Sequence, residues 1–150
     1  MGKKTLLSIL LAALVASGAI GYANLKLPYV KNLQITGIEA STINPGAYVV
    51  TGLVDVDFKN HKAWVEGVGG YKEDNFYYMN KWWDENMEGK DFSFDGQEVK
   101  KLGHEVKALK GLLPKGIYVV HLYSIDWELD QHYKNHDRVR FTAELQLMYT

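Results

Sequence analysis

The chain has 150 residues, a formal net charge of −1 at pH 7, 13% aromatic residues and no cysteine. The near-neutral charge excludes a protein that binds nucleic acid through a strongly basic surface. Because disulfides cannot form, packing, a bound ion or assembly must stabilise the fold. The length suits one domain with a sizeable core.

The first 23 residues have the features of an export signal. Two lysines form a basic start, residues 6–16 are an apolar run, and small residues at the end predict cleavage between Ala23 and Asn24. The alternative is a retained anchor, because residues 5–23 carry no charge and approach the length that spans a bilayer. We expect contact with a membrane only through this segment.

Residues 24–32 form a short tail in which large apolar side chains alternate with other types. Leu25, Leu27 and Tyr29 share one face of this tail if it is extended. An exposed strand-forming segment promotes aggregation unless another segment receives it. We expect these three residues to form a donor strand that pairs with a neighbouring copy, and pairing within the same chain is the alternative.

The remaining residues, 33–150, predict a single domain that begins with strands. Residues 33–38 predict a short strand, and residues 41–46 predict a turn because proline and glycine stand together there. Alternation over residues 47–58 predicts a half-buried antiparallel strand, and residues 63–68 predict the return strand. The face expected to be buried carries Tyr48, Val50, Val54, Val56 and Phe58.

The apolar spacing then changes to three or four residues, which is typical of an amphipathic helix. Residues 73–87 predict one helix, and residues 97–113 predict a second. Between them, residues 90–96 predict a loop or a short extended piece. The apolar stripe of the first helix contains one polar residue and consists of Phe76, Asn80, Trp83 and Met87.

Two strong strands close the chain. Residues 117–127 are apolar on both faces and predict a central strand. Residues 128–137 form a polar connection, and residues 138–149 alternate throughout. The whole pattern predicts a mainly β fold: a jelly-roll-like antiparallel β-sandwich with two inserted helices, preceded by the N-terminal signal or hydrophobic helix.

No residue pattern supports catalysis. The stretch from His104 to Ala108 begins like a helical zinc-protease motif, but alanine stands where the second histidine is required. His132 and His136 are spaced for zinc on a helix, yet their segment is better interpreted as a solvated turn. We therefore expect a protein that is not an enzyme and that has no cofactor.

Two kinds of ligand are compatible with parts of the sequence. Several carboxylates offer hard oxygen ligands for calcium, although a solvated acidic face is the default interpretation. Exposed aromatic rings bind carbohydrate in many proteins, and Trp82 is the candidate, although aromatic residues also form cores and interfaces. The carboxylates are Asp55, Asp57, Asp126, Glu128 and Asp130.

Four features occur together along the chain. The predicted signal ends in Gly21-Tyr22-Ala23, and the turn Ile43-Asn44-Pro45-Gly46 precedes a strand that ends Phe58-Lys59-Asn60. A helical insertion follows, and the closing run from Val139 to Gln146 comes after a polar loop. In this combination the chain resembles the TasA/camelysin family of exported matrix-fibre proteins, and the archaeal bundling-pilus subunits similar to them. The resemblance implies a jelly-roll subunit that polymerises by donor-strand exchange.

We therefore expect a secreted, non-enzymatic structural subunit of an extracellular filament, either a pilus or a biofilm-matrix fibre. Its partners are copies of itself, because head-to-tail contacts do not close and so build a homopolymer. The alternative is a monomeric β-sandwich domain, secreted or anchored at the cell surface, that binds a ligand such as carbohydrate.

Overall fold

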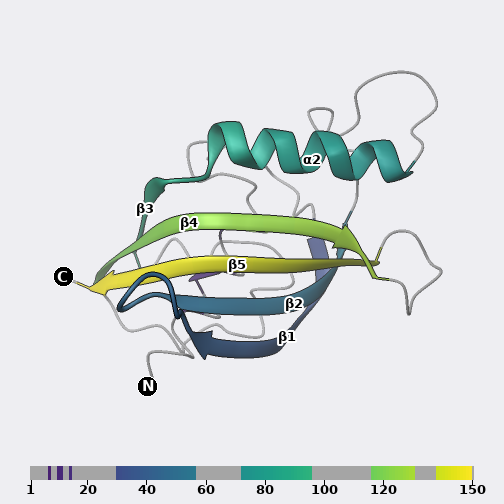
Figure 1. Cartoon of the computed structure of the whole chain (residues 1–150). Coiled ribbons are helices and arrows are strands. Elements are labelled where there is room, and N and C mark those ends of the chain that lie inside the picture. The colour runs from purple at the N-terminus through teal and green to yellow at the C-terminus, as the bar shows by residue number, and fades with distance from the viewer. Residues whose placement is uncertain are drawn as a thin grey trace.

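The structure is a computed structural model of the whole chain (Figure 1), and it describes residues 7, 10, 11, 14, 30–56, 72–95, 116–130 and 138–149. The strands in these ranges are β1 (Val30–Ala40), β2 (Tyr48–Val56), β3 (Lys90–Asp95), β4 (Ile117–Leu129) and β5 (Arg138–Tyr149), and the longest helix is α2 (Lys72–Asn86). The prediction of a mainly β fold is confirmed. The predicted strand at 63–68 and the predicted second helix at 97–113 lie outside the described residues.

The five strands form one antiparallel sheet in the order β1-β2-β5-β4-β3. β2, β5 and β4 therefore lie in its interior, while β1 and β3 are its edges. α2 lies along β4, on the side of the sheet away from β1 (Figure 1). The chain passes from α2 directly into β3, so both elements are neighbours of β4.

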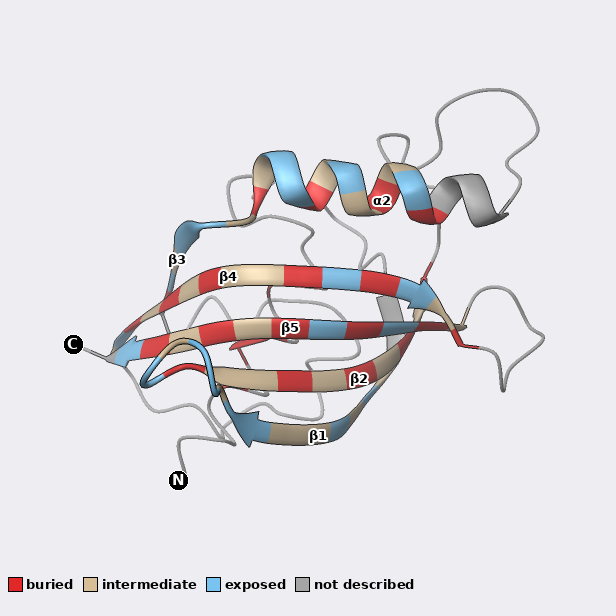
Figure 2. Cartoon of the chain, in the orientation of Figure 1, coloured by how far each residue is buried: buried red, intermediate tan, exposed pale blue. Residues whose placement is uncertain are grey.

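Buried side chains gather on one face of the sheet, which we call the inner face. Every second residue of β2 and β5 is buried (Figure 2), as the alternating pattern predicts. The opposite, outer face carries polar and half-exposed side chains. The buried sheet residues are Val50, Val54, Val56, Phe94, Tyr118, Val120, Leu122, Ile125, Trp127, Val139, Phe141, Ala143, Leu145 and Leu147.

β4 differs from its prediction because it contains an irregularity. Its pairing with β5 shifts between Leu122 and Ser124, so the alternation between faces changes phase there. Tyr118 before the shift and Ile125 and Trp127 after it are all buried. The strand thus has one continuous apolar stripe on the inner face, and its place between β5 and β3 agrees with the prediction of a strand inside the sheet.

α2 packs on the inner face through aromatic side chains. The ring of Trp83 lies 5.4 Å from that of Trp127, which lies 5.6 Å from the ring of Phe141. These contacts join the helix to the interior strand β5. Trp82, expected to be exposed, is half-buried and packs against the core. The fully or nearly buried residues of the helix and the turn after it are Phe76, Met79, Trp83 and Met87.

Four leucines of the N-terminal apolar segment belong to the same core. Leu7, Leu10, Leu11 and Leu14 are helical and fully buried, and their spacing puts them on one helical face. They join the cluster formed by the inner face and α2. Burial of four leucines contributes roughly 6–12 kcal/mol before entropic costs, which is comparable with the whole stability of a typical domain.

Among the helices of the described ranges, none is long and apolar enough to cross a membrane.

Candidate functional site

The sheet has two edges that differ in what lies beside them. β3 is a short edge of 6 residues, and its Asp91 and Ser93 are exposed. β1 is 11 residues long, and no strand of the described ranges pairs with its far side. An unpaired edge presents N–H and C=O groups that another strand can bind. β1 is therefore the surface of the described fold best suited to pair with another chain.

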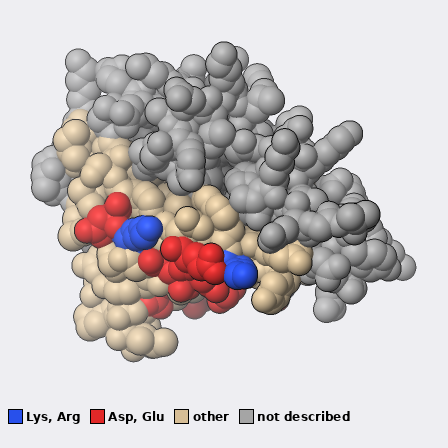
Figure 3. Space-filling model, turned by 90° about the horizontal axis from the view of Figure 1, so that it is seen from above, with Lys and Arg blue, Asp and Glu red and all other residues tan. Residues whose placement is uncertain are grey.

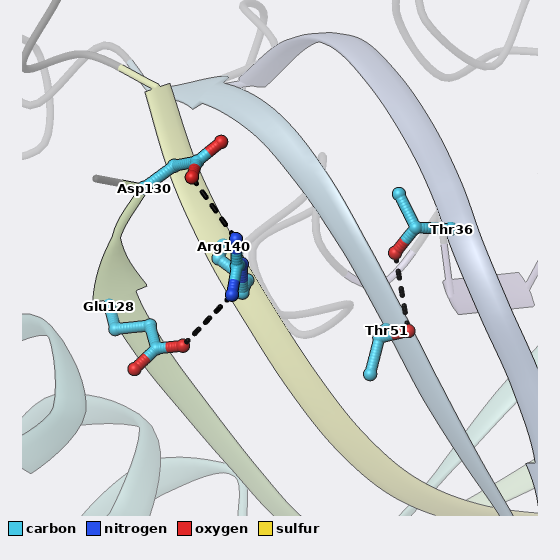
Figure 4. Close-up of polar contacts among 5 residues, drawn as sticks. All are labelled: Thr36, Thr51, Glu128, Asp130 and Arg140. Carbon is cyan, nitrogen blue, oxygen red and sulfur yellow. Dashed lines mark hydrogen bonds and ion pairs between the residues drawn. The ribbon is translucent and has the colours of Figure 1, made fainter. Parts of the chain in front are cut away.

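β1 is irregular along part of its length. Its pairing with β2 shifts at two places, the second of which lies between Ile35 and Gly37. At that place Thr36 Oγ1 donates a hydrogen bond to Thr51 Oγ1 at 3.2 Å (Figure 4). Such shifts twist an edge and limit strand addition. The longest stretch of β1 that pairs with β2 without a shift is therefore residues 37–40. This stretch is the most regular part of the edge that a strand from another chain could pair with.

The turn between β1 and β2 is fixed to β5 by a single carboxylate. Ser41 Oγ donates a hydrogen bond to Glu144 Oε1 at 3.0 Å, and the Asn44 side-chain amide donates to Glu144 Oε2. Ser41 Oγ also accepts a hydrogen bond from the N–H of Asn44 at 3.0 Å. Gly46 has a φ of 86°, which favours glycine. The predicted turn is confirmed, and it holds the end of β1 in place.

The free part of β4, beyond β3, is sealed by side chains of α2 and of the turn that follows it. The side-chain amide of Asn80 donates a hydrogen bond to the carbonyl oxygen of Trp127 at 2.9 Å, and its oxygen accepts one from the Trp127 N–H at 2.8 Å. The Glu88 carboxylate accepts a hydrogen bond from the N–H of Ile125. Asn80 thus makes the pair of bonds that a residue of a neighbouring strand makes, and this edge does not need another strand.

Carboxylates crowd together where α2 meets β4. Figure 3 shows acidic side chains gathered on the described surface between two basic groups. Burial raises the pKa of the Asp84 carboxyl above its ordinary value, and the negative charge of Asp126 raises it further. Burial likewise raises the pKa of Glu88, followed by the charges of Asp84 and Asp126. Three carboxylates therefore repel one another at neutral pH.

We expect the substitution Asp84→Asn to increase the free energy of unfolding at pH 7 and to flatten its dependence on pH. A carboxyl whose pKa is higher in the folded state than in the unfolded state stabilises the fold below the unfolded pKa. It loses that contribution as the pH rises through the folded pKa. The ordinary values are 3.8 for Asp84 and 4.5 for Glu88, so the difference between variant and wild type should shrink from pH 7 toward pH 4. Urea unfolding at several pH values measures this difference, and an unchanged or growing difference would contradict the repulsion.

Two arginines on the outer face hold carboxylates of neighbouring strands. Arg140 lies 3.1 Å from Asp130 and 3.9 Å from Glu128 (Figure 4), and Arg138 lies 3.2 Å from Asp55. Asp130 is the most buried of these carboxylates, with 2% of its side chain exposed. The ion pairs neutralise the acidic groups and join β5 to β2 and β4.

These ion pairs revise the expectation of a calcium site. Asp55, Glu128 and Asp130 face arginines rather than one another, while Asp126 belongs to the cluster with Asp84 and Glu88. Calcium requires six to eight converging oxygen ligands. In the described ranges no group of three or more acidic, histidine or cysteine side chains is arranged to hold a metal. The four described carboxylates among those proposed for calcium are therefore separated into different contacts, and Asp57 lies outside the described residues.

Several predicted site residues lie outside the described ranges, and their positions stay predictions. By contrast, Asn80 and Glu88 were not predicted to have any role in sealing an edge. The sequence did contain a signal for Asn80, because a polar amide within a buried apolar stripe requires a partner. The residues outside the described ranges are Ala23, Asn24, Leu25, Leu27, Tyr29, Asp57, His104, Ala108, His132 and His136.

Comparison of the chain with protein-family models, with curated proteins and with solved structures finds no significant match in any of the three.

Proposed function

We propose that the protein is an exported, non-enzymatic structural subunit of an extracellular filament, a pilus or a biofilm-matrix fibre, whose copies join by donor-strand complementation. The observation that carries this proposal is the difference between the two sides of the sheet. On one side the edge strand β3 has 6 residues and α2 seals the part of β4 beyond it, whereas on the other side the 11-residue β1 has no neighbour on its far side among the described strands. We infer that such a subunit accepts a strand along its longer edge, β1.

The position of the tail supports pairing with a second copy. β1 begins at Val30, earlier than predicted, and pairs there with Val56, so the tail of residues 24–29 directly precedes the edge strand. To pair with its own β1, the tail would have to reverse direction, and the shortest reversal takes about two residues and leaves about four for pairing. Pairing with a second copy needs no reversal and keeps Leu25, Leu27 and Tyr29 available.

Strand addition would supply both affinity and specificity. Backbone groups of the tail would bond the edge, while Leu25, Leu27 and Tyr29 would fill apolar sites at alternate positions. Each large apolar side chain contributes about 1.5–3 kcal/mol before ordering costs. Because each copy donates at one place and accepts at another, the contact would repeat without closing and build a filament.

The proposed architecture is a jelly-roll-like sandwich. One sheet with a single buried face must be covered by a second layer, and α2 lies along only one side of it. We infer that residues 57–71 and 96–115 complete that layer, with the second helix predicted at 97–113. In this arrangement the described sheet is one half of the sandwich.

Electron microscopy of two chains tests the proposal. A chain of residues 24–150 should form filaments, whereas a chain of residues 30–150, which keeps all of β1, should remain soluble and folded. The triple variant Leu25→Ser, Leu27→Ser, Tyr29→Ser in the longer chain should also fail to polymerise. The matched control Lys26→Ser should polymerise like the parent.

Each of the other results has a defined meaning. If both chains stay monomeric and folded, the filament proposal fails, and the alternative of a secreted or surface-anchored binding domain takes its place. Retention on immobilised carbohydrate that is lost on Trp82→Ala would support that alternative. If both chains polymerise, assembly is real but residues 24–29 are not the donor strand.

A further inference from the structure

The turn between β1 and β2 contains an Asn44-Pro45 peptide bond whose carbonyl group is held by a hydrogen bond. The N–H of Ala47 donates to the carbonyl oxygen of Asn44 at 3.1 Å. Between them stand Pro45 and Gly46, and the φ of 86° at Gly46 is the value that the third residue of a type II turn adopts. Ala47 is only 2% exposed, so water competes little for its N–H.

The side chain of Asn44 is held by a carboxylate. Its amide nitrogen, Nδ2, donates a hydrogen bond to Oε2 of Glu144, and the other oxygen of that carboxylate accepts one from Ser41 Oγ at 3.0 Å. A carboxylate accepts protons, and an N–H group beside a base is a stronger nucleophile than a free one. Asn44 therefore has a base at its side-chain nitrogen and a hydrogen-bond donor at its backbone carbonyl oxygen.

The proline leaves this asparagine one intramolecular reaction with its own backbone. When another residue follows an asparagine, the N–H of that residue can attack the side-chain carbonyl carbon, and the asparagine deamidates. Pro45 has no N–H, so this route is closed. The remaining route is the reverse attack, by Nδ2 on the backbone carbonyl carbon of the same residue. Both reacting atoms belong to Asn44, so no second molecule has to be brought into place.

We propose that the chain cleaves itself once at the Asn44-Pro45 bond, with Asn44 Nδ2 as the nucleophile and Glu144 as the general base. Glu144 accepts the proton of Nδ2 as the new C–N bond closes a succinimide ring. The Ala47 N–H stabilises the negative charge that develops on the carbonyl oxygen. The bond to Pro45 then breaks with its electron pair on the proline nitrogen, which receives the proton from Glu144.

The products follow from this balance. One is residues 1–44 with a succinimide at its end, and the other is residues 45–150 with the free amine of Pro45 at its start. The reaction consumes no water and leaves Glu144 as a carboxylate again. The pairing of β1 with β2 extends from Val30 to Ala40 and does not include the broken bond. The two pieces should therefore stay together in the folded protein and separate in denaturant.

Mass spectrometry of the full-length chain, kept with protease inhibitors at neutral pH, tests the proposal. The wild-type chain should yield fragments 1–44 and 45–150 whose masses add up to that of the intact chain. Asn44→Ala should stay intact, and Glu144→Gln should cleave roughly 100-fold more slowly. The matched control Glu39→Gln, which changes an exposed carboxylate of β1, should cleave like the wild type.

A second measurement needs no variant, in case Glu144→Gln alters the turn. Hydroxylamine present during the incubation should convert the succinimide of residues 1–44 into a hydroxamate. A fragment released by a protease ends in a carboxylate and would not react. A wild-type chain that stays intact, a fragment 1–44 without hydroxamate, or equal rates for wild type and Glu144→Gln would each overturn the proposal. The inference does not depend on the filament function, because the reaction takes place within one copy.

Discussion

The substitution Asn80→Ala should lower the free energy of unfolding by about 3 kcal/mol, because it removes both hydrogen bonds to the backbone of Trp127. Trp127 is only 2% exposed, so its N–H and C=O would be left without a partner in a site that water hardly reaches. An unsatisfied buried group costs about 1–3 kcal/mol. The loss should therefore exceed that of a surface substitution several-fold.

Urea unfolding followed by tryptophan fluorescence measures this loss. Asn86→Ala is the matched control, because the Asn86 amide donates a hydrogen bond at 2.8 Å only to the Trp82 carbonyl within the same helix. The control should change stability by less than about 0.5 kcal/mol. Equal losses for the two variants would show that Asn80 has no special role at the edge of β4.

The substitution Gly52→Ala should lower the free energy of unfolding by about 3 kcal/mol, because the interior of the sheet has no space for the added methyl group. A Cβ atom at this position would lie 2.6 Å from Cζ of Phe141 and 2.6 Å from the backbone oxygen of Gln34. The aromatic ring is buried and the oxygen belongs to β1, so neither neighbour can move away without a shift of the strands.

Thermal and urea unfolding of two further variants test this explanation. Gly37→Ala is the control, because its added Cβ would meet a single side-chain atom, Thr51 Oγ1, at 2.8 Å. It should cost less than about 1 kcal/mol. In a chain with Phe141→Leu, Gly52→Ala should cost less than in the parent, since ring atoms are removed from the contact. If the changes in the free energy of unfolding caused by Gly52→Ala and Phe141→Leu are additive, the added methyl group does not clash with the ring of Phe141.

Local patterns in the sequence were sufficient to predict the parts of the fold that repeat regularly. β5 lies at residues 138–149 as predicted, and α2 differs from its predicted range by one residue at each end. In β2, Val50, Val54 and Val56 are buried as predicted, while Tyr48 is half-buried. β3 was predicted as a loop or short extended piece, and it is extended. In these elements the spacing of apolar residues directly reflects which face is buried.

The sequence could not reveal features that depend on contacts between distant segments. In β4 the alternation of buried and exposed residues shifts by one position between Leu122 and Ser124. In the sequence this single apolar stripe therefore resembles a strand that is apolar on both faces, because alternation alone does not show where a strand adds a residue. The bonds from Asn80 to Trp127 join residues 47 positions apart, and no local spacing encodes them. Likewise, Arg138 and Arg140 pair with carboxylates that the sequence suggested as calcium ligands.

The side chains that α2 places against β4 make the two sides of the sheet unequal in their ability to pair with another strand. A β-rich protein precipitates when sheets from different molecules merge side by side in either direction. Here the part of β4 beyond β3 is closed by a helix whose Asn80 bonds the backbone of Trp127 as a strand would, and strand pairing along that part would first require the helix to detach. Substitutions that affect solubility can therefore accumulate in β1 and its short regular stretch, while those in the part of β4 beyond β3 must also preserve its contacts with α2.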